Sequence, residues 1–406
     1  MPDLREYRMF CLWKRGLGLL GALAIAALAA DAPVANSASD VAYKNYRMPS
    51  GPFSIHVVRV PRNKTLFEVQ TVHAQGSAVG LDSLSEQVRL LDSASATAVA
   101  GINGDFYLRD GAYAGDPRGL QIVNGELISA PAGSASFWID APGDPHTSIT
   151  VSEFQVTWPD GKTSPIGLNG RREPAEIELY TPAFGPSTHT VRGRELVLEQ
   201  QGNSSWLPLR PARVYRARVR EVRESGDSRI RPGTMVLSLG PIVVRTAPRI
   251  EAGAELLIST ATSPSLKGAR TAISGGPVLV ANGKRQPIKG GDSGGYQFSS
   301  MTERHPRSAI GWNDESFFLV EVDGRQQLSA GMTLNELAAF LVELGCREAM
   351  NLDGGGSATL WFDGKVRNRP CEGGERPVAN ALVVLKKKNG SSEKAQAGTT
   401  PSALNP

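Results

Sequence analysis

The chain has 406 residues, with 44 basic and 40 acidic side chains and a formal net charge of +4. The first 16 residues carry four basic and two acidic residues, and residues 386–406 carry four basic and one acidic, which leaves the body between them at −1. That body has no basic stripe with interleaved aromatic residues, so its composition excludes nucleic acid as an expected partner. Residues 40–385 are long enough to bury a large core, in one domain or two lobes.

The N-terminus has the pattern of a secretory signal peptide. Four basic residues precede its apolar run: Arg5, Arg8, Lys14 and Arg15. Residues 17–30 are almost wholly Gly, Ala, Leu and Ile, which is short for a membrane span, although an uncleaved anchor stays open. Cys11 lies before the apolar run, so no lipid-modified N-terminus is predicted. We expect residues 1–30 to be removed, leaving a secreted or periplasmic protein without stable membrane insertion.

A helix, a strand and an acidic loop are predicted in that order near the start of the body. Four apolar residues are spaced for one helical face: Leu81, Leu84, Val88 and Leu91. Residues 98–102 follow as a strand, which opens onto Asn103, Gly104 and Asp105. Asn-Gly alone is typical of a hairpin turn, and that alternative stays open. The carboxylate and the aromatic pair Phe106-Tyr107 favour a binding site.

The middle of the chain, about residues 140–260, predicts a β-rich lobe. Short alternating patterns occur over five segments: 148–158, 176–180, 195–199, 214–222 and 234–244. Residues 180–186 combine Tyr180 and Phe184 with two prolines, so their aromatic rings either stack on sugars or pack in the core, and core packing is the favoured interpretation. With few helices elsewhere, the fold class predicted is α+β, with a strand-rich mixed sheet.

Two further loops lead into apolar strands. Gly275 and Gly276 precede Pro277 and the strand that follows it, and we expect exposed backbone amides there. Arg307 stands at the entrance of the strand that begins after His305-Pro306, where an arginine fork suits a phosphate or carboxylate. A surface ion pair is the alternative for Arg307, and a single loop histidine such as His305 is more often a surface residue than a catalyst.

The helix, strand and acidic loop order occurs a second time at residues 333–357. Thr333 and Glu336 form a capping box, the helix ends at Gly345, and a short strand then opens onto Asp353 and three glycines. A glycine turn with a capping aspartate is the alternative. If the strands before Asp105 and Asp353 are neighbours in one sheet, both carboxylates lie at its carboxyl edge.

The sequence also bears on the pairing of the two cysteines in the body and on whether the C-terminal segment is ordered. Cys346 and Cys371 either pair in an oxidising compartment or stay as buried free thiols. Residues 386–406 begin with three lysines and continue with Gly, Ser, Thr and Pro, which predicts a disordered, solvated tail.

Taken in order, these motifs resemble the phosphodiester glycosidases related to the lysosomal enzyme that uncovers mannose 6-phosphate by removing N-acetylglucosamine. The resemblance spans roughly residues 50 to 385. It rests on six segments: 103–107, 119–125, 274–277, 306–311, 351–357 and 376–381. Residues 165–240 are similar to the longer, bacterial exported branch, and nothing in that segment repeats the cysteine-rich extension of the animal enzyme.

The resemblance implies site residues, which transfer position by position. The catalytic residues implied are Asp105, Asp353 and Arg307. The substrate-binding residues implied are Asn103, Gly275, Gly276, Gly354, Gly355, Gly356 and Ser357, with Arg376 and Asn380 as supports. In this reading Arg307 and the glycine amides hold the phosphate oxygens, and the two aspartates flank the anomeric carbon, with their individual roles undetermined.

The function this predicts is an exported hydrolase that cleaves the anomeric C–O bond of a sugar 1-phosphodiester, of the N-acetylglucosamine type, in cell-envelope or exopolysaccharide material. No cofactor is certain. Paired aspartates also suit Ca²⁺ or Mg²⁺, but no ligand spacing selects a metal. Two other classes stay open: a metal-dependent phosphodiesterase that breaks the P–O bond, and a glycan-binding or envelope-assembly protein without turnover.

Overall fold

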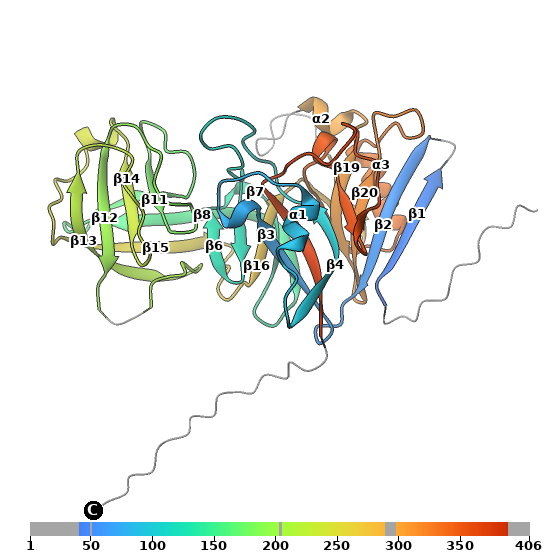
Figure 1. The fold of residues 1–406 in the computed structure, drawn as a ribbon, viewed down its shortest axis with the longest axis horizontal. Coiled ribbons are helices and arrows are strands. Elements are labelled where there is room, and N and C mark those ends of the chain that lie inside the picture. Colours follow the sequence, from blue (N-terminus) through green and yellow to red (C-terminus); the bar gives the residue numbers. More distant parts are fainter. Residues whose placement is uncertain (1–39, 49–50, 203–204, 289–297, 389–406) are drawn as a thin grey trace, which may run out of the picture. The chain divides into compact units, whose positions relative to one another are not determined.

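The computed structural model describes residues 40–48, 51–202, 205–288 and 298–388 (Figure 1). The predicted signal peptide and residues 389–406 lie outside these ranges. Within them, no helix combines the length and apolar character needed to cross a membrane. The described chain is rich in strands, which form three sheets, and it has three α-helices, so the predicted α+β class is confirmed.

The sheets have seven, five and twelve strands. The seven-stranded sheet has the order β1 (Ala42–Met48), β2 (Phe53–Pro61), β20 (Ser316–Val322), β19 (Arg307–Trp312), β21 (Glu348–Asn351), β17 (Val278–Ala281) and β18 (Lys284–Arg285). The five-stranded sheet has the order β23 (Lys365–Val366), β22 (Leu360–Phe362), β4 (Ala96–Asn103), β24 (Asn380–Lys387) and β3 (Phe67–His73). Both are antiparallel in every pairing between these strands.

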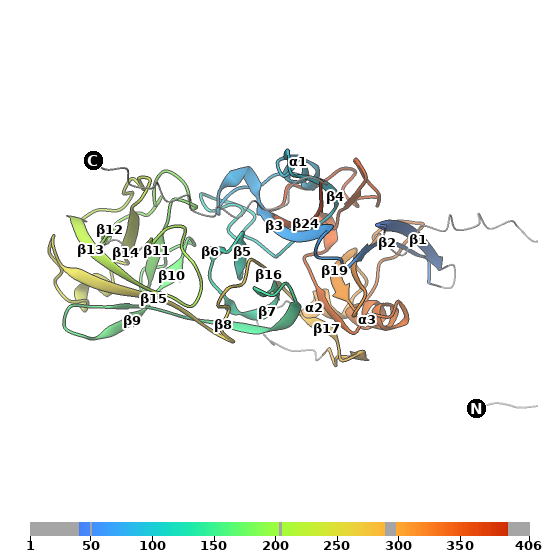
Figure 2. The same cartoon turned by 90° about the horizontal axis from the view of Figure 1, so that it is seen from below.

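The twelve-stranded sheet joins the middle of the chain to strands near the site. Its order is β10 (Gly167–Leu168), β11 (Ile177–Tyr180), β14 (Met235–Leu239), β12 (Arg194–Gln200), β13 (Val214–Arg223), β15 (Glu255–Ser263), β8 (Pro145–Thr157), β7 (Ala132–Ile139), β16 (Thr271–Gly275), β5 (Gln121–Val123) and β6 (Glu126–Ser129), and β9 (Thr163–Pro165) pairs with β8. Figure 2 shows β8 and β15 running from the β-rich middle segment toward β7 and β16. The middle segment is therefore β-rich as predicted, but it shares its sheet with β7 and β16.

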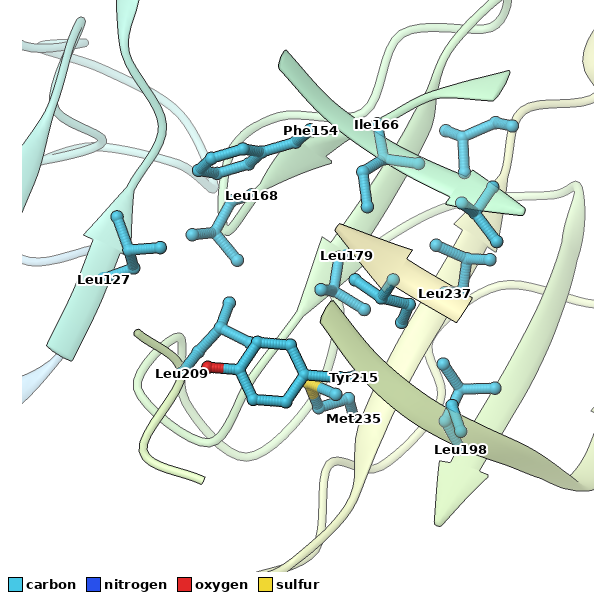
Figure 3. Close-up of a cluster of buried hydrophobic side chains, with 14 of the residues drawn as sticks. Leu127, Phe154, Ile166, Leu168, Leu179, Leu198, Leu209, Tyr215, Met235 and Leu237 are labelled. Atoms are coloured by element: carbon cyan, nitrogen blue, oxygen red, sulfur yellow. The ribbon is translucent and has the colours of Figure 1, made fainter. Parts of the chain in front are cut away.

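Strand boundaries in the middle segment follow the predicted patterns with one exception. The alternating buried and exposed residues of β13 match the 214–222 pattern. The 234–244 prediction is too long, because β14 ends at Leu239 and a 3-10 turn, Val243–Arg245, follows it. A buried apolar cluster, which includes Phe154, Leu179 and Leu237, fills this part of the protein (Figure 3).

The aromatic residues of the 180–186 segment belong to the core. Tyr180 and Phe184 are 0% and 2% exposed, and their ring centroids lie 4.8 Å apart. The favoured interpretation of core packing is confirmed, and sugar stacking on these rings is excluded because solvent does not reach them.

The seven-stranded and five-stranded sheets pack face to face, and a helix covers the outer face of each. Helix α3 (Leu334–Glu343) packs on one face of the seven-stranded sheet, whose other face shares a core with the five-stranded sheet. Helix α1 (Leu84–Arg89) covers the far face of the five-stranded sheet through Leu84 and Val88. The short helix α2 (Phe298–Thr302) precedes β19.

The two predicted helices are confirmed, and their caps explain their lengths. Helix α3 begins after Thr333, whose side chain and that of Glu336 make the predicted capping box, and Gly345 follows its end with φ of 90°. Helix α1 begins after Ser83, whose hydroxyl accepts a hydrogen bond from the backbone N–H of Glu86. Leu81 therefore lies before the helix.

Two predictions about the cysteines and the tail need correction. Cys346 and Cys371 are both free thiols, so the disulfide alternative is wrong. Cys346 packs with α3 on one face of the seven-stranded sheet, and burial raises its pKa to about 12. Cys371 contributes to raising the pKa of Glu321. The side chain of Glu321 points to the face of β20 that lies opposite α3. The tail begins later than predicted, since residues 386 and 387 end β24.

Glu178 on β11 gives a stability prediction. Glu178 is 5% exposed, and burial, with a smaller contribution from Asp116, raises its pKa to about 8. The unfolded chain loses this proton at a pH near the ordinary value of 4.5, so the stability contributed by the neutral side chain is present below that pH and is lost as the pH rises through about 8. We expect Glu178→Gln to raise the free energy of unfolding at pH 8 by about 2 to 4 kcal/mol.

The measurement is denaturant unfolding at pH 4 and pH 8. Glutamine keeps the oxygen that accepts the N–H of Gly170 at 2.7 Å, so little change is expected at pH 4. Glu153→Gln, at an exposed glutamate of β8 that does not act on Glu178, is the matched control and should change neither value. An equal gain at both pH values would contradict the titration of Glu178 as the cause.

Candidate active site

Asp105 and Asp353 meet at the junction of two sheets. The condition considered for these strands, that β4 and β21 are neighbours in one sheet, is not met, because β4 lies in the five-stranded sheet and β21 in the seven-stranded sheet. The loops after them are joined instead by the backbone N–H of Asp353, which donates to the carbonyl of Gly104 at 2.9 Å. The amide nitrogen of Asn103 donates to the carbonyl of Asp353 at 2.7 Å, and Ser308 Oγ donates to Asn103 Oδ1 at 2.6 Å.

Asn103 and Asn380 hold this junction and do not line the cavity beside it. Both are 0% exposed. Asn380 Oδ1 accepts the backbone N–H of Asp105 at 2.8 Å, and its Nδ2 donates to Gln121 Oε1 at 3.2 Å. Direct substrate binding by Asn103 stays a prediction, and the supporting role predicted for Asn380 agrees with these contacts. Asn380 is a support for Asp105, and Asn103 is a support for Asp353.

A cavity of about 510 Å³ lies at this junction. Its titratable lining consists of two aspartates, one histidine, one tyrosine and five arginines: Asp105, Asp353, His305, Tyr107, Arg109, Arg118, Arg307, Arg325 and Arg376. All five predicted glycines and Ser357 also line it: Gly275, Gly276, Gly354, Gly355 and Gly356. Five guanidinium groups against two carboxylates favour an anionic ligand.

Asp105 is the more deeply buried carboxylate. It is 3% exposed, and burial raises its pKa to about 8, against the opposing hydrogen bond from the N–H of Phe106 at 2.8 Å. Its second oxygen, Oδ2, is buried and has no hydrogen-bond partner among the described residues. At neutral pH this side chain therefore keeps its proton and can donate it.

Asp353 titrates at a lower pH than Asp105. Burial raises its pKa to about 6, while hydrogen bonds from Ser357 and from the N–H of Gly354, at 2.9 Å, oppose the rise. Arg376 and Arg109 lower it further through their charges. The two carboxyl groups of one cavity thus differ in pKa, and at neutral pH Asp353 is the ionised member of the pair.

Arg307 is anchored by backbone carbonyls. Its Nε donates to the carbonyl of Met332 at 2.8 Å, and its Nη2 donates to the carbonyls of Glu303, at 2.8 Å, and Ser300. Burial and the charge of Arg325 lower its pKa to about 10. These bonds fix the segment before β19, so the surface ion-pair alternative is wrong. A direct contact between Arg307 and substrate stays a prediction.

The glycine loops line the cavity, but most of their amides are already used. The N–H of Gly276 donates to Asn351 at 2.7 Å, that of Gly355 to Pro306 at 2.9 Å, and that of Gly354 to Asp353. The N–H groups of these three residues are therefore not available for the expected amide cradle, because carbonyl and carboxylate oxygens of the protein already accept them. Glycine is required at 354 for space, since a Cβ there would lie 2.6 Å from the Pro306 oxygen.

Arg376 and Ser357 support Asp353 together. The guanidinium of Arg376 makes a two-point ion pair with Glu372, and its Nη1 donates to Ser357 Oγ at 3.4 Å. A Cβ on Gly356 would collide with this guanidinium, so the third glycine is needed for the close approach of Arg376. The supporting role predicted for Arg376 agrees with these contacts.

Arg109 and Arg118 were missed by the sequence reasoning. Both are exposed and line the cavity, and within the described ranges no hydrogen bond or ion pair of either side chain is present. Arg109 acts electrostatically on Asp353, and Arg118 acts on Asp105. They lie outside the motifs, four residues after Asp105 and directly before Gly119, and this closeness to two motifs is the signal that the sequence offers. Their exposed guanidinium groups at the cavity are therefore able to bind an anion.

Arg118→Gln tests this role. We expect an increase in KM of about 10-fold toward a sugar phosphodiester, with a smaller effect on kcat, because a charge-assisted contact to the phosphate is lost. Steady-state kinetics measures both constants. Arg216→Gln, which alters an exposed arginine of β13 outside the cavity, is the matched control. An unchanged KM in the Arg118 variant would remove this side chain from phosphate binding.

The charge around the two aspartates bears on the divalent cation considered for them. Five arginines line the cavity with the pair, so a Ca²⁺ or Mg²⁺ ion would enter a field that already carries excess positive charge. Metal dependence of the reaction stays an untested prediction.

The fold and the cavity define a strand-rich protein with an anion site built around two carboxylates. Residues 214–385 match the model of the phosphodiester glycosidase family, which confirms the resemblance for the motifs within that range. The matched range contains Arg307 and Asp353, whereas Asp105 lies before it. This match supports glycosidase action on sugar phosphodiesters in general.

Individual relatives are more distant. Over 135 residues the chain is 33% identical to the SPbeta prophage-derived uncharacterized protein YomE of Bacillus subtilis (strain 168), which covers 33% of this chain and 19% of that protein. A hypothetical protein from Synechocystis has a TM-score of 0.69 at 21% identity, over 85% of this chain and 62% of that one. A protein of Burkholderia pseudomallei K96243, named as an exported protein, has a TM-score of 0.62 at 20% identity, over 82% and 74%.

These comparisons differ in what they support. The chain spans less than two thirds of the YomE and Synechocystis proteins, so nothing about those whole proteins transfers to it. At 21% and 20% identity, the two structural similarities show the fold alone.

Proposed function

We propose that this protein is an exported hydrolase that cleaves the anomeric C–O bond of a sugar 1-phosphodiester, of the N-acetylglucosamine type, in cell-envelope or exopolysaccharide material. The observation that carries the proposal is the pair Asp105 and Asp353, whose pKa values of about 8 and about 6 are separated within one arginine-lined cavity. Export rests on the N-terminal sequence pattern alone.

The two aspartates take different roles in this proposal. Asp353, ionised at neutral pH, attacks the anomeric carbon or removes a proton from the water that does. Asp105, still protonated, donates its proton to the bridging oxygen as the C–O bond breaks. The hydroxyl of water ends on the anomeric carbon, and the phosphate monoester leaves with the bridging oxygen. Arg109 and Arg118 stabilise the charge on that phosphate.

Isotope labelling tests the bond that is broken. Purified protein is incubated with methyl-phospho-N-acetylglucosamine and with UDP-N-acetylglucosamine in ¹⁸O-labelled water, and the products are analysed by mass spectrometry. Label on the sugar is expected. Label on the phosphate would assign the protein to the phosphodiesterases, and saturable polysaccharide binding without any product, over a wider substrate panel, would assign it to the glycan-binding proteins.

A further inference from the structure

A second group of potential ligands lies apart from the cavity, between the seven-stranded sheet and the segment that follows β22. His56 on β2 and Glu321 on β20 are direct register partners, and Asp323 follows the end of β20. One ligand atom from each lies within 4.8 Å of the others. The three residues are 5%, 1% and 6% exposed, and none of them lines the cavity.

One atom of this group has no partner. Glu321 Oε2 is buried and makes no hydrogen bond with any described residue. The ion pairs of the described residues do not include Glu321, and they give Asp323 only His56, at 3.0 Å. Two buried carboxylates beside one imidazole are costly unless protons or a cation neutralise them.

The other atoms of the group are already oriented from outside. His56 Nδ1 lies 2.7 Å from the hydroxyl of Tyr43. His56 Nε2 lies 3.0 Å from Asp323 Oδ2, its shortest contact, and Ser54 Oγ and Asn45 Nδ2 lie 3.2 and 3.3 Å from the same nitrogen. Asp323 Oδ1 accepts the backbone N–H of Arg369 at 2.8 Å. Protein metal sites hold their ligands in this way, with one histidine nitrogen and one carboxylate oxygen fixed by neighbouring groups while the other atom binds the ion.

We propose that His56, Glu321 and Asp323 bind a divalent transition-metal ion, and that Zn²⁺ fits these donors best. One imidazole and two carboxylates suit Zn²⁺, whereas Ca²⁺ and Mg²⁺ take oxygen ligands alone. In the bound state the ion lies between His56 Nε2, Asp323 Oδ2 and Glu321 Oε2. It replaces the hydrogen bond between His56 and Asp323 and gives Glu321 its missing partner.

The ion would have a structural role, because it would hold two chain segments that lead to the cavity. Asp323 precedes Arg325 by two residues, and its partner Arg369 begins the segment that leads to Arg376. The side chain of Gln326 also donates to the carbonyl of Arg369 at 2.6 Å. Arg325 and Arg376 both line the cavity. A metal bound where these two segments begin would therefore fix the positions of two of the five arginines that line the cavity.

The first experiment measures metal bound to the purified full chain by elemental mass spectrometry and by calorimetric titration with Zn²⁺ after treatment with a chelator. We expect about one Zn²⁺ per chain and a higher Tm when the metal is restored. Glu321→Gln should weaken Zn²⁺ binding about 100-fold or more and abolish the rise in Tm. His146→Gln, which alters a half-buried histidine paired with Asp140 at 2.8 Å, is the matched control and should change neither.

The Glu321→Gln variant also distinguishes a cluster that a metal ion neutralises from a cluster that protons neutralise. Glutamine has the shape of a protonated glutamic acid, so a cluster neutralised only by protons would tolerate the change, and wild-type protein would bind no Zn²⁺. That pair of results would overturn the proposal. Metal content and Tm are read without substrate, so this outcome is independent of whether the glycosidase activity is found.

Discussion

Replacing Asp353 by asparagine should lower kcat toward a sugar 1-phosphodiester by about 10³- to 10⁴-fold. The ionised carboxylate is the group that attacks the anomeric carbon or activates water, and an amide does neither. Asparagine keeps an oxygen for the N–H of Gly354, which donates to Asp353 Oδ1 at 2.9 Å, so the loop should keep its form. Removal of a carboxylate that burial already destabilises should not lower the Tm.

The control for this variant is Asp116→Asn. Asp116 is also a buried aspartate, with a pKa raised by burial to about 7, but it does not line the cavity. Its Oδ2 accepts the backbone N–H of Arg171 at 3.2 Å, an interaction that asparagine can also make. Turnover and Tm are measured for both variants. Full activity of the Asp353 variant, or an equal loss in the Asp116 variant, would remove Asp353 from the chemistry.

Local features were predicted from the sequence where the signal lies within a few residues. The capping box of Thr333 and Glu336 fixes the start of α3 because both partners belong to one helical turn. The acidic loops follow β4 and β21 as predicted, because an apolar run that ends in Asn or Asp and glycine has few other local structures.

Features that depend on distant segments were not predicted. The sheet to which β4 and β21 belong is decided by pairings such as that of β24 with β3 and β4, which link residues about 300 positions apart in sequence and leave no local pattern. The partners of Arg307 are backbone carbonyls, among them that of Met332, and any residue type supplies a carbonyl. The motif therefore located Arg307 correctly and left its contacts undetermined.

The arginines of the cavity also show that local sequence does not predict contacts between distant segments. Arg376 was found because it belongs to a motif, whereas Arg109 and Arg118 are two of many arginines in the chain until the fold brings them to one cavity. Charge convergence is a tertiary property. It becomes visible only when the loops after β4 and β21 are placed together, as the bond between Asp353 N–H and the Gly104 carbonyl places them.

The pH dependence of kcat/KM should be bell-shaped, with a rise through about pH 6 and a fall through about pH 8. Activity requires Asp353 without its proton, so it increases as the pH passes the Asp353 pKa of about 6. It requires Asp105 with its proton, so it decreases as the pH passes the Asp105 pKa of about 8. Initial rates at low substrate concentration from pH 4.5 to 9.5 measure both limbs.

Asp105→Asn should lower kcat/KM about 100-fold near pH 7 and remove the fall above pH 8, because the variant has no proton to lose there. The size of the loss should depend on the leaving group. A dinitrophenyl glycoside of the same sugar leaves without protonation, so the variant should cleave it almost as fast as the wild-type protein does. If the alkaline fall persists in the variant, another group titrates near pH 8, and His305 is excluded from that role because burial and neighbouring arginines lower its pKa. Tyr107 also lines the cavity, but burial raises its pKa above the ordinary value of 10, so it does not account for a fall near pH 8 either.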